Sequence, residues 1–267
     1  AMSRALTGLG IIACLSGPLG GLLASHLGWR ATMAALGCFG GLALLLILLR
    51  FEETLARPNP LALHPAHLLR TWAQILRHPT FLAFSATTTF TYAGLFTYLA
   101  ASSFTFIQVL GWSPAAYGLL LACNAALYIT GTFVCRRLLA RWGLRRSMAL
   151  AGLLSATGGT LMGVAALAGV QSGWAYALPF MLFQMAHGIH MPCSQSGAVG
   201  PFPHAAGTAA ALNGFAMMLV AFGMGLWLGQ RMDGTVLPLA LGVWFWGVCA
   251  ALAAWTLVQK FGVPTKA

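Results

Sequence analysis

Acidic residues are almost missing from this chain: among its 267 residues there are three, Glu52, Glu53 and Asp233. Charged residues of both signs make up 6% of the sequence, whereas a soluble domain contains about a quarter. Hydrophobic residues reach 59%. Because so few charges cannot cover the surface of a soluble fold, most of this surface must face lipid. The composition excludes a soluble globular protein and indicates a membrane protein.

The sequence also lacks the patterns that carry enzymatic or metal chemistry. It has no G-x-S-x-G elbow and no phosphate-binding loop, and the pair His187-x-x-His190 has no acidic residue in its segment. The six cysteines form no C-x-x-C pair and lie within or at the ends of apolar stretches, where buried, inert thiols are typical. We therefore expect no enzyme, no cofactor and no bound metal. The cysteines are Cys14, Cys38, Cys123, Cys135, Cys193 and Cys249.

Basic residues, which give the chain a formal net charge of +11, gather in alternate gaps between the apolar segments. A nucleic-acid partner would need them together on one solvated face, so we expect none. In polytopic membrane proteins the basic loops stay on the cytoplasmic side. Here the alternation puts twelve Lys and Arg residues on one side of the membrane and two on the other. It predicts that both ends of the segment are cytoplasmic.

Eight stretches are apolar over the roughly 20 residues that a helix needs to cross the hydrocarbon core. They are residues 5–25, 31–49, 80–107, 115–135, 148–169, 174–196, 205–230 and 235–258. The predicted fold class is therefore all-α, a polytopic transmembrane helix bundle with eight spans.

The one sizeable segment outside these spans is residues 51–79. It begins with two glutamates and a proline-rich run, and its second part places Leu68, Leu69, Trp72, Ile75 and Leu76 on one face of a helix. This pattern predicts a short amphipathic helix on the inner membrane surface. We interpret it as a tether between two bundles, with a regulatory role as the alternative.

Two spans, a long linker with an amphipathic helix and six further spans resemble a major facilitator superfamily transporter without its first four helices. Members of that family have twelve helices in two halves, so the spans here would be helices five to twelve. The resemblance implies three parts: residues 1–50 are the end of the N-terminal half, 51–79 the cytoplasmic linker, and 80–267 the six-helix C-terminal half. We expect the natural product to include further helices before residue 1.

Two local motifs resemble those of the family. Gly17, Pro18 and Gly21 match the core of the motif that antiporters carry in their fifth helix, with a glycine-rich packing face as the alternative interpretation. The cytoplasmic loop with Arg141, Gly143, Arg145 and Arg146 resembles the basic loop between the second and third helices of each half. The acidic residue that precedes the first arginine in the family is Ala140 here. A loop that only sets topology is the alternative.

Residues 184–197 and 205–212 resemble the corresponding stretches of the Bcr/CflA group of drug-resistance transporters, through a Gly-x-x-x-Pro segment and an Ala-Gly-Thr-Ala entry to the next helix. The resemblance implies proton-coupled efflux of drug-like small molecules by alternating access, in the inner membrane of a bacterium. The protein would be a monomer whose partners are the substrate, protons and the lipid bilayer. A facilitator for a sugar or amino acid, and an inactive transporter fragment, are the alternatives.

Polar residues inside apolar spans are the candidates for a substrate cavity, because they are costly in lipid and face a cavity or another helix. Two faces are marked out by helical spacing, one with Thr91 and Tyr98 and one with Gln184 and His187; His190 lies about 60° from the latter. The further candidates are Phe96, Asn124 and Asn213, with Phe183 as a second stacking surface. The alternative is structural, since such hydroxyls bond their own backbone and lone amides join helices.

No acidic residue lies within a span, although proton-coupled transporters commonly use a membrane-embedded carboxylate. Coupling would then depend on a histidine or on helices that precede this segment. We favour the preceding helices.

Overall fold

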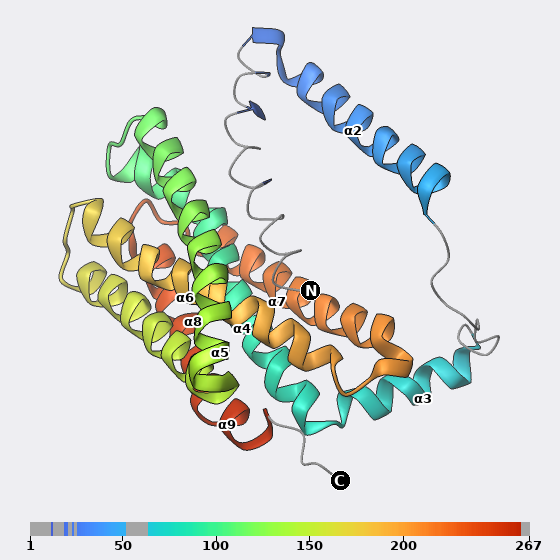
Figure 1. Ribbon diagram of the computed structural model, residues 1–267. Coiled ribbons are helices and arrows are strands. Elements are labelled where there is room, and N and C mark those ends of the chain that lie inside the picture. The colour runs from blue at the N-terminus through green and yellow to red at the C-terminus, as the bar shows by residue number, and fades with distance from the viewer. Residues whose placement is uncertain (1–11, 13–18, 21–22, 24–25, 52–63, 263–267) are drawn as a thin grey trace.

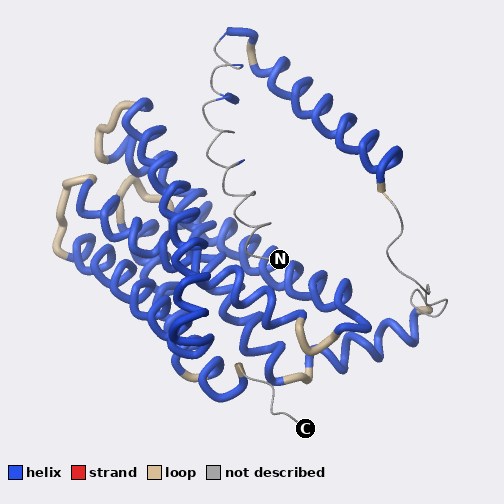
Figure 2. Tube along the Cα trace, in the orientation of Figure 1, coloured by secondary structure: helices blue, strands red, loops and turns tan. Residues whose placement is uncertain are grey.

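The computed structural model describes residues 26–51 and 64–262, together with residues 12, 19, 20 and 23. Within these residues the chain is helical, with no strand, and short loops join long helices (Figure 2). The elements are α2 (Trp29–Arg50), α3 (Pro65–Leu76), α4 (Pro79–Ser103), η1 (Phe104–Val109), α5 (Pro114–Leu167), α6 (Trp174–Val199), η2 (Pro203–Ala205), α7 (Ala206–Arg231), α8 (Leu237–Trp255) and α9 (Leu257–Phe261). The predicted all-α fold class is confirmed.

Helix α5 consists of two helices that meet at Gly143. Its 54 residues would reach about 80 Å at 1.5 Å per residue, far more than a bilayer is thick. At Gly143 the backbone has φ 72° and ψ 178°, a conformation that side chains with a Cβ strongly disfavour. The two halves correspond to the spans expected at 115–135 and 148–169. Both helices run further than expected, so the gap between them shrinks to a single glycine.

Most of the expected spans have a counterpart among the described helices. Helices long and apolar enough to cross a membrane occupy residues 29–50, 79–109, 114–167, 203–231 and 237–261. Of these, 114–167 accounts for two spans because of its break at Gly143. Helix α6 has 26 residues and sufficient length, but its polar side chains keep its hydropathy below that of the others. The span expected at 5–25 falls almost entirely outside the described residues.

The first two described helices stand outside the bundle core. Helix α2 buries none of its residues and lies apart from the other helices (Figure 1). Helix α3 forms as predicted and packs one side chain, Ile75, into the bundle. Leu69, Trp72 and Leu76 on α3 remain exposed. An apolar stripe of this kind is suited to the surface of a membrane. The placement of α3 on the inner membrane surface stays a prediction.

Helices α4 to α8 form the bundle, with α5 and α6 as its most extensive pairing and α8 packed against α4 and α5 (Figure 1). Glycines allow several backbones to touch. A Cβ added at Gly158 would lie 2.5 Å from the Pro179 carbonyl oxygen, and one at Gly247 would lie 2.7 Å from that of Ser155. Small residues at such crossings are the usual means of packing helices in lipid, where no hydrophobic driving force holds them together.

Candidate functional site

The polar candidate residues of the spans are buried in the structure. Thr91, Tyr98, His190, Asn124, Gln184, His187 and Asn213 are between 0% and 7% exposed, and Phe96 is half-buried. They come from α4, α5, α6 and α7, with Thr91, Phe96 and Tyr98 all on α4. We call the buried polar residues from these four helices the polar belt: Thr91, Tyr98, Asn124, Gln184, His187 and Asn213.

Helices α4 and α6 are joined at the polar belt by a side-chain hydrogen bond. The Thr91 hydroxyl oxygen lies 3.0 Å from Nδ1 of His187. Other threonines of α4 behave differently: the hydroxyls of Thr87, Thr88 and Thr97 donate to the carbonyl oxygen four residues earlier. Thr91 therefore uses its hydroxyl between helices, whereas its neighbours bond their own helix. Thr91 thus does not bond its own backbone, and its role in a substrate cavity stays a prediction.

A third helix reaches the same histidine through Tyr128 of α5. The centres of the Tyr128 and His187 rings are 5.5 Å apart and their planes are tilted by 38°. The sequence interpretation missed Tyr128, although it lies four residues after Asn124 and so shares its helical face. Helices α4, α5 and α6 therefore meet at the side chains of Thr91, Tyr128 and His187.

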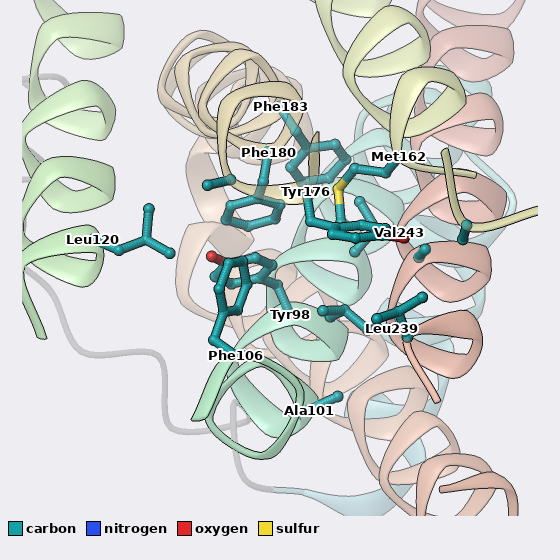
Figure 3. Packing of buried hydrophobic residues seen from close by; sticks show 14 of the residues in the cluster. Tyr98, Ala101, Phe106, Leu120, Met162, Tyr176, Phe180, Phe183, Leu239 and Val243 are labelled. Carbon is teal, nitrogen blue, oxygen red and sulfur yellow. The ribbon is translucent and has the colours of Figure 1, made fainter. Parts of the chain in front are cut away.

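Tyr98 and Asn124 form a second connection between α4 and α5. The Asn124 Nδ2 group donates to the Tyr98 hydroxyl oxygen over 3.5 Å, a long and therefore weak hydrogen bond. The Tyr98 ring stacks on Phe180, with 3.4 Å between ring centres (Figure 3). The hydroxyl of Tyr98 thus belongs to the polar belt, whereas its ring belongs to the apolar core.

Several buried polar atoms of the belt have no hydrogen-bond partner among the described residues. They are the side-chain carbonyl oxygens of Asn124, Gln184 and Asn213. A buried polar group without a partner costs about 1–3 kcal/mol, so native proteins satisfy nearly all of them with protein, water or a ligand. Three such amides on three helices give the belt free acceptors for a polar ligand.

His190 faces a different neighbour from His187, although the two are three residues apart. It is fully buried beside the backbone of Ala151 in the second half of α5. Neither of its ring nitrogens makes a well-formed hydrogen bond within the described part of the chain. His190 therefore lies beside the belt with two buried ring nitrogens that no described group satisfies, and its role in a substrate cavity stays a prediction.

The two aromatic candidates occupy different surroundings. Phe183 is fully buried, stacks on Phe180 with ring centres 5.6 Å apart, and belongs to the aromatic core that contains Tyr98 (Figure 3). A Cβ at Gly94 of α4 would collide with its ring. Phe96 is half-buried and lies next to Gly225 of α7. The packing of Phe183 contradicts its interpretation as a free stacking surface, because the core leaves no exposed face on its ring.

Of the two motifs that resemble the family, the structure describes only the basic loop. Gly17, Pro18 and Gly21 lie outside the described residues. In the basic loop, Arg141, Arg145 and Arg146 are exposed around the break at Gly143. The Gln259 side-chain amide donates to the Arg145 carbonyl oxygen over 3.0 Å, which ties this loop to α9.

The loop between α7 and α8 contains Asp233, the acidic residue that lies within the described part of the chain. Its carboxylate accepts hydrogen bonds from the backbone N–H and the hydroxyl of Thr235, at 3.0 and 2.6 Å. These bonds favour the ionised form and hold the pKa of Asp233 below its ordinary value. Asp233 therefore serves the turn and does not face the polar belt.

Comparison with known proteins identifies the family. Residues 1–226 match the sequence profile of the Major Facilitator Superfamily. The chain belongs to the major facilitator superfamily. Members of this family are transporters and not enzymes, and the described helices include several that are long and apolar enough to cross a membrane, so the chain is a multi-pass membrane protein of that family.

Two curated relatives can be aligned with the chain. It is 22% identical over 242 residues to a bicyclomycin resistance protein homolog of Haemophilus influenzae, which covers 91% of this chain and 61% of that protein. It is 28% identical over 109 residues to the uncharacterized MFS-type transporter YdgK of Bacillus subtilis, which covers 41% of this chain and 27% of that one. The chain thus spans less than two thirds of the length of either relative. The resemblance to a major facilitator transporter is confirmed.

Proposed function

We propose that this chain forms helices five to twelve of a secondary active transporter that exports drug-like small molecules from a bacterial cell in exchange for protons. The proposal draws on the family membership and on the alignment of 91% of the chain with a bicyclomycin resistance protein homolog. The short stretches at residues 184–197 and 205–212, which resemble the Bcr/CflA group, agree with it. Transport would proceed by alternating access around a midplane site.

The polar belt is the part of the chain that we assign to substrate. The observation that carries this assignment is the hydrogen bond between Thr91 and His187, which joins α4 and α6 in the interior of the bundle. The buried side-chain amides of Asn124, Gln184 and Asn213, from α5, α6 and α7, add acceptors that have no partner among the described residues. A site with a few convergent polar groups among aromatic and aliphatic side chains is typical of small-molecule binding. Uncharged acceptors of this kind suit a polar, amphiphilic substrate.

Proton coupling is assigned to residues that precede this segment. None of the belt residues is acidic, and a buried carboxylate is the usual proton carrier of such transporters. His187 is the alternative carrier, because its imidazole titrates near neutral pH when it is free. Both ends of the segment lie in the cytoplasm in this proposal, as the distribution of basic residues predicts.

Drug susceptibility of cells that express the complete gene tests the export proposal. Tolerance of amphiphilic antibiotics should rise several-fold over cells with an empty vector. The control is a Gly118→Ala variant, since Gly118 is exposed on α5 with open space around it; it should confer the same tolerance. Unchanged tolerance across a broad panel, with the protein present in the membrane, would argue against efflux and favour a facilitator for a sugar or amino acid.

Replacement of His187 separates binding from proton transfer. His187→Ala removes the hydrogen bond to Thr91, so efflux should fall. His187→Gln keeps a hydrogen-bonding group that does not titrate, and it should retain more efflux than the alanine variant if the role is binding. Full efflux by His187→Ala between pH 6 and 8 would remove this residue from the mechanism.

A further inference from the structure

Helices α5 and α6 approach closely where two glycines face each other. A Cβ added at Gly131 of α5 would lie 2.5 Å from the Met185 carbonyl oxygen and 3.0 Å from the Cα of Gly188. Gly188 in turn faces the backbone of Tyr128 and Gly131. The two backbones therefore touch directly at this crossing, with no side chain between them. Residues on either side of it are held at short range.

One turn further along both helices, the crossing brings two thiols together. The sulfur atoms of Cys135 and Cys193 are 3.3 Å apart, and both side chains are buried, at 0% and 4% exposure. The Cys135 thiol donates to the Ile189 carbonyl oxygen over 3.7 Å. Either thiol can be the donor in the contact between the two sulfurs. Each sulfur thus points at the other, and both cysteines are unbridged.

We propose that Cys135 and Cys193 are a modification site, a dithiol that a membrane-permeant two-electron oxidant converts to a disulfide joining α5 to α6. A disulfide bond is about 2.05 Å long, so the sulfurs must approach by roughly 1.2 Å. Of the described cysteines, this is the pair whose sulfurs are in contact. Cys38 is exposed on α2, whereas Cys123 and Cys249 are half-buried.

The oxidation can be written with a diazene such as diamide as the oxidant. The first thiol adds across the N=N bond, so its sulfur bonds one nitrogen and its proton goes to the other. The second thiol then attacks that sulfur, the S–N bond breaks and the S–S bond forms, and its proton goes to the departing nitrogen. Two thiols lose two electrons and two protons, and the diazene becomes a hydrazine.

The bridge would act on the part of α5 that contacts the polar belt. Cys135 follows Tyr128 by seven residues and so lies on the same face of α5, and the Tyr128 ring packs against His187. A covalent link at Cys135 would fix the separation of α5 and α6 two turns from that contact. The site depends on the geometry of the crossing and not on which substrate the protein carries.

Site-specific cleavage of the complete protein in native membranes tests the proposal. A protease site inserted into the exposed turn at residues 169–172 divides the chain between the two cysteines. After diamide treatment, blocking of remaining thiols with N-ethylmaleimide and cleavage, the two pieces should stay joined on a non-reducing gel and separate with dithiothreitol. Cys135→Ser and Cys193→Ser should abolish the joined product, whereas the matched control Cys123→Ser should keep it.

Two results of the cleavage experiment would overturn the proposal. The first is separation of the wild-type pieces without reductant after oxidation. The second is a joined product that survives in Cys135→Ser, because another cysteine would then form the bridge. Peptide mass spectrometry of the protein without the inserted site decides independently of the variants: it should find a peptide with Cys135 linked to Cys193, and recovery of both cysteines alkylated after oxidation contradicts the assignment.

Discussion

Gly131→Ala should destabilise the protein through the crossing of α5 and α6. The new methyl group would meet the Met185 carbonyl oxygen at 2.5 Å, and an ordinary contact begins near 3.4 Å, so the helices must separate by about 0.9 Å. The neighbouring atoms belong to the backbone of α6, so no side chain can rotate away. Overpacking of this kind costs about 1–3 kcal/mol. With roughly 2–4 °C lost per kcal/mol for a chain of this size, the melting temperature should fall by about 2–12 °C.

The assay is thermal unfolding of the purified complete protein in detergent, followed by the loss of its monodisperse peak in size-exclusion chromatography. Gly118→Ala is the matched control on the same helix, because a Cβ there meets nothing within 4 Å. Alanine is the better helix former, so this control should melt at or above the wild-type temperature. If Gly131→Ala melts as high as Gly118→Ala, the close crossing does not exist and the contact between Cys135 and Cys193 loses its basis.

Further predictions concern the loop and the belt. Gly143→Ala forces a side chain into a backbone conformation with φ 72°, so it should cost about 1–3 kcal/mol and lower the melting temperature; an unchanged value would mean that the break between the halves of α5 does not require glycine. Thr91→Val removes the hydrogen bond to His187, so it should lower the free energy of unfolding by about 0.6–2 kcal/mol and reduce efflux. Thr97→Val should leave efflux unchanged, because the Thr97 hydroxyl bonds its own helix. Equal loss of efflux in both variants would refute the different roles of the two hydroxyls. Hydrogen bonds from Thr235 favour the ionised form of Asp233, so the turn should stabilise the protein fully above the ordinary carboxyl pKa and lose this contribution as pH falls through the lowered pKa. The difference in melting temperature between wild type and Asp233→Ala should therefore shrink in acid. A difference that does not depend on pH would contradict this role of Asp233.

The sequence predicted the helices well, because apolar length and helical spacing are local properties. The amphipathic helix at Pro65–Leu76 follows from the spacing of its leucines and Trp72. The basic loop was predicted less well. Its arginines indicated a twelve-residue gap, but long arginine side chains reach the interface from the end of a helix, so the helices continue to Gly143.

The partners of polar side chains could not be read from the sequence. Thr87 and Thr91 share a face and a residue type, yet one bonds its own helix and the other bonds His187, a choice made by where α6 passes. His187 and His190 differ by about 60° around α6, enough to give them different neighbouring helices. The contact between Cys135 and Cys193 joins residues 58 positions apart, and spacing alone does not pair cysteines.

Transport by the complete protein, purified and reconstituted in proteoliposomes under an imposed pH gradient, tests the central proposal most directly. An amphiphilic drug should move in the direction opposite to the proton flow, a protonophore should abolish this movement, and His187→Ala should reduce its rate. Drug movement that is indifferent to the gradient, or no movement at all by folded protein, would contradict proton-coupled efflux.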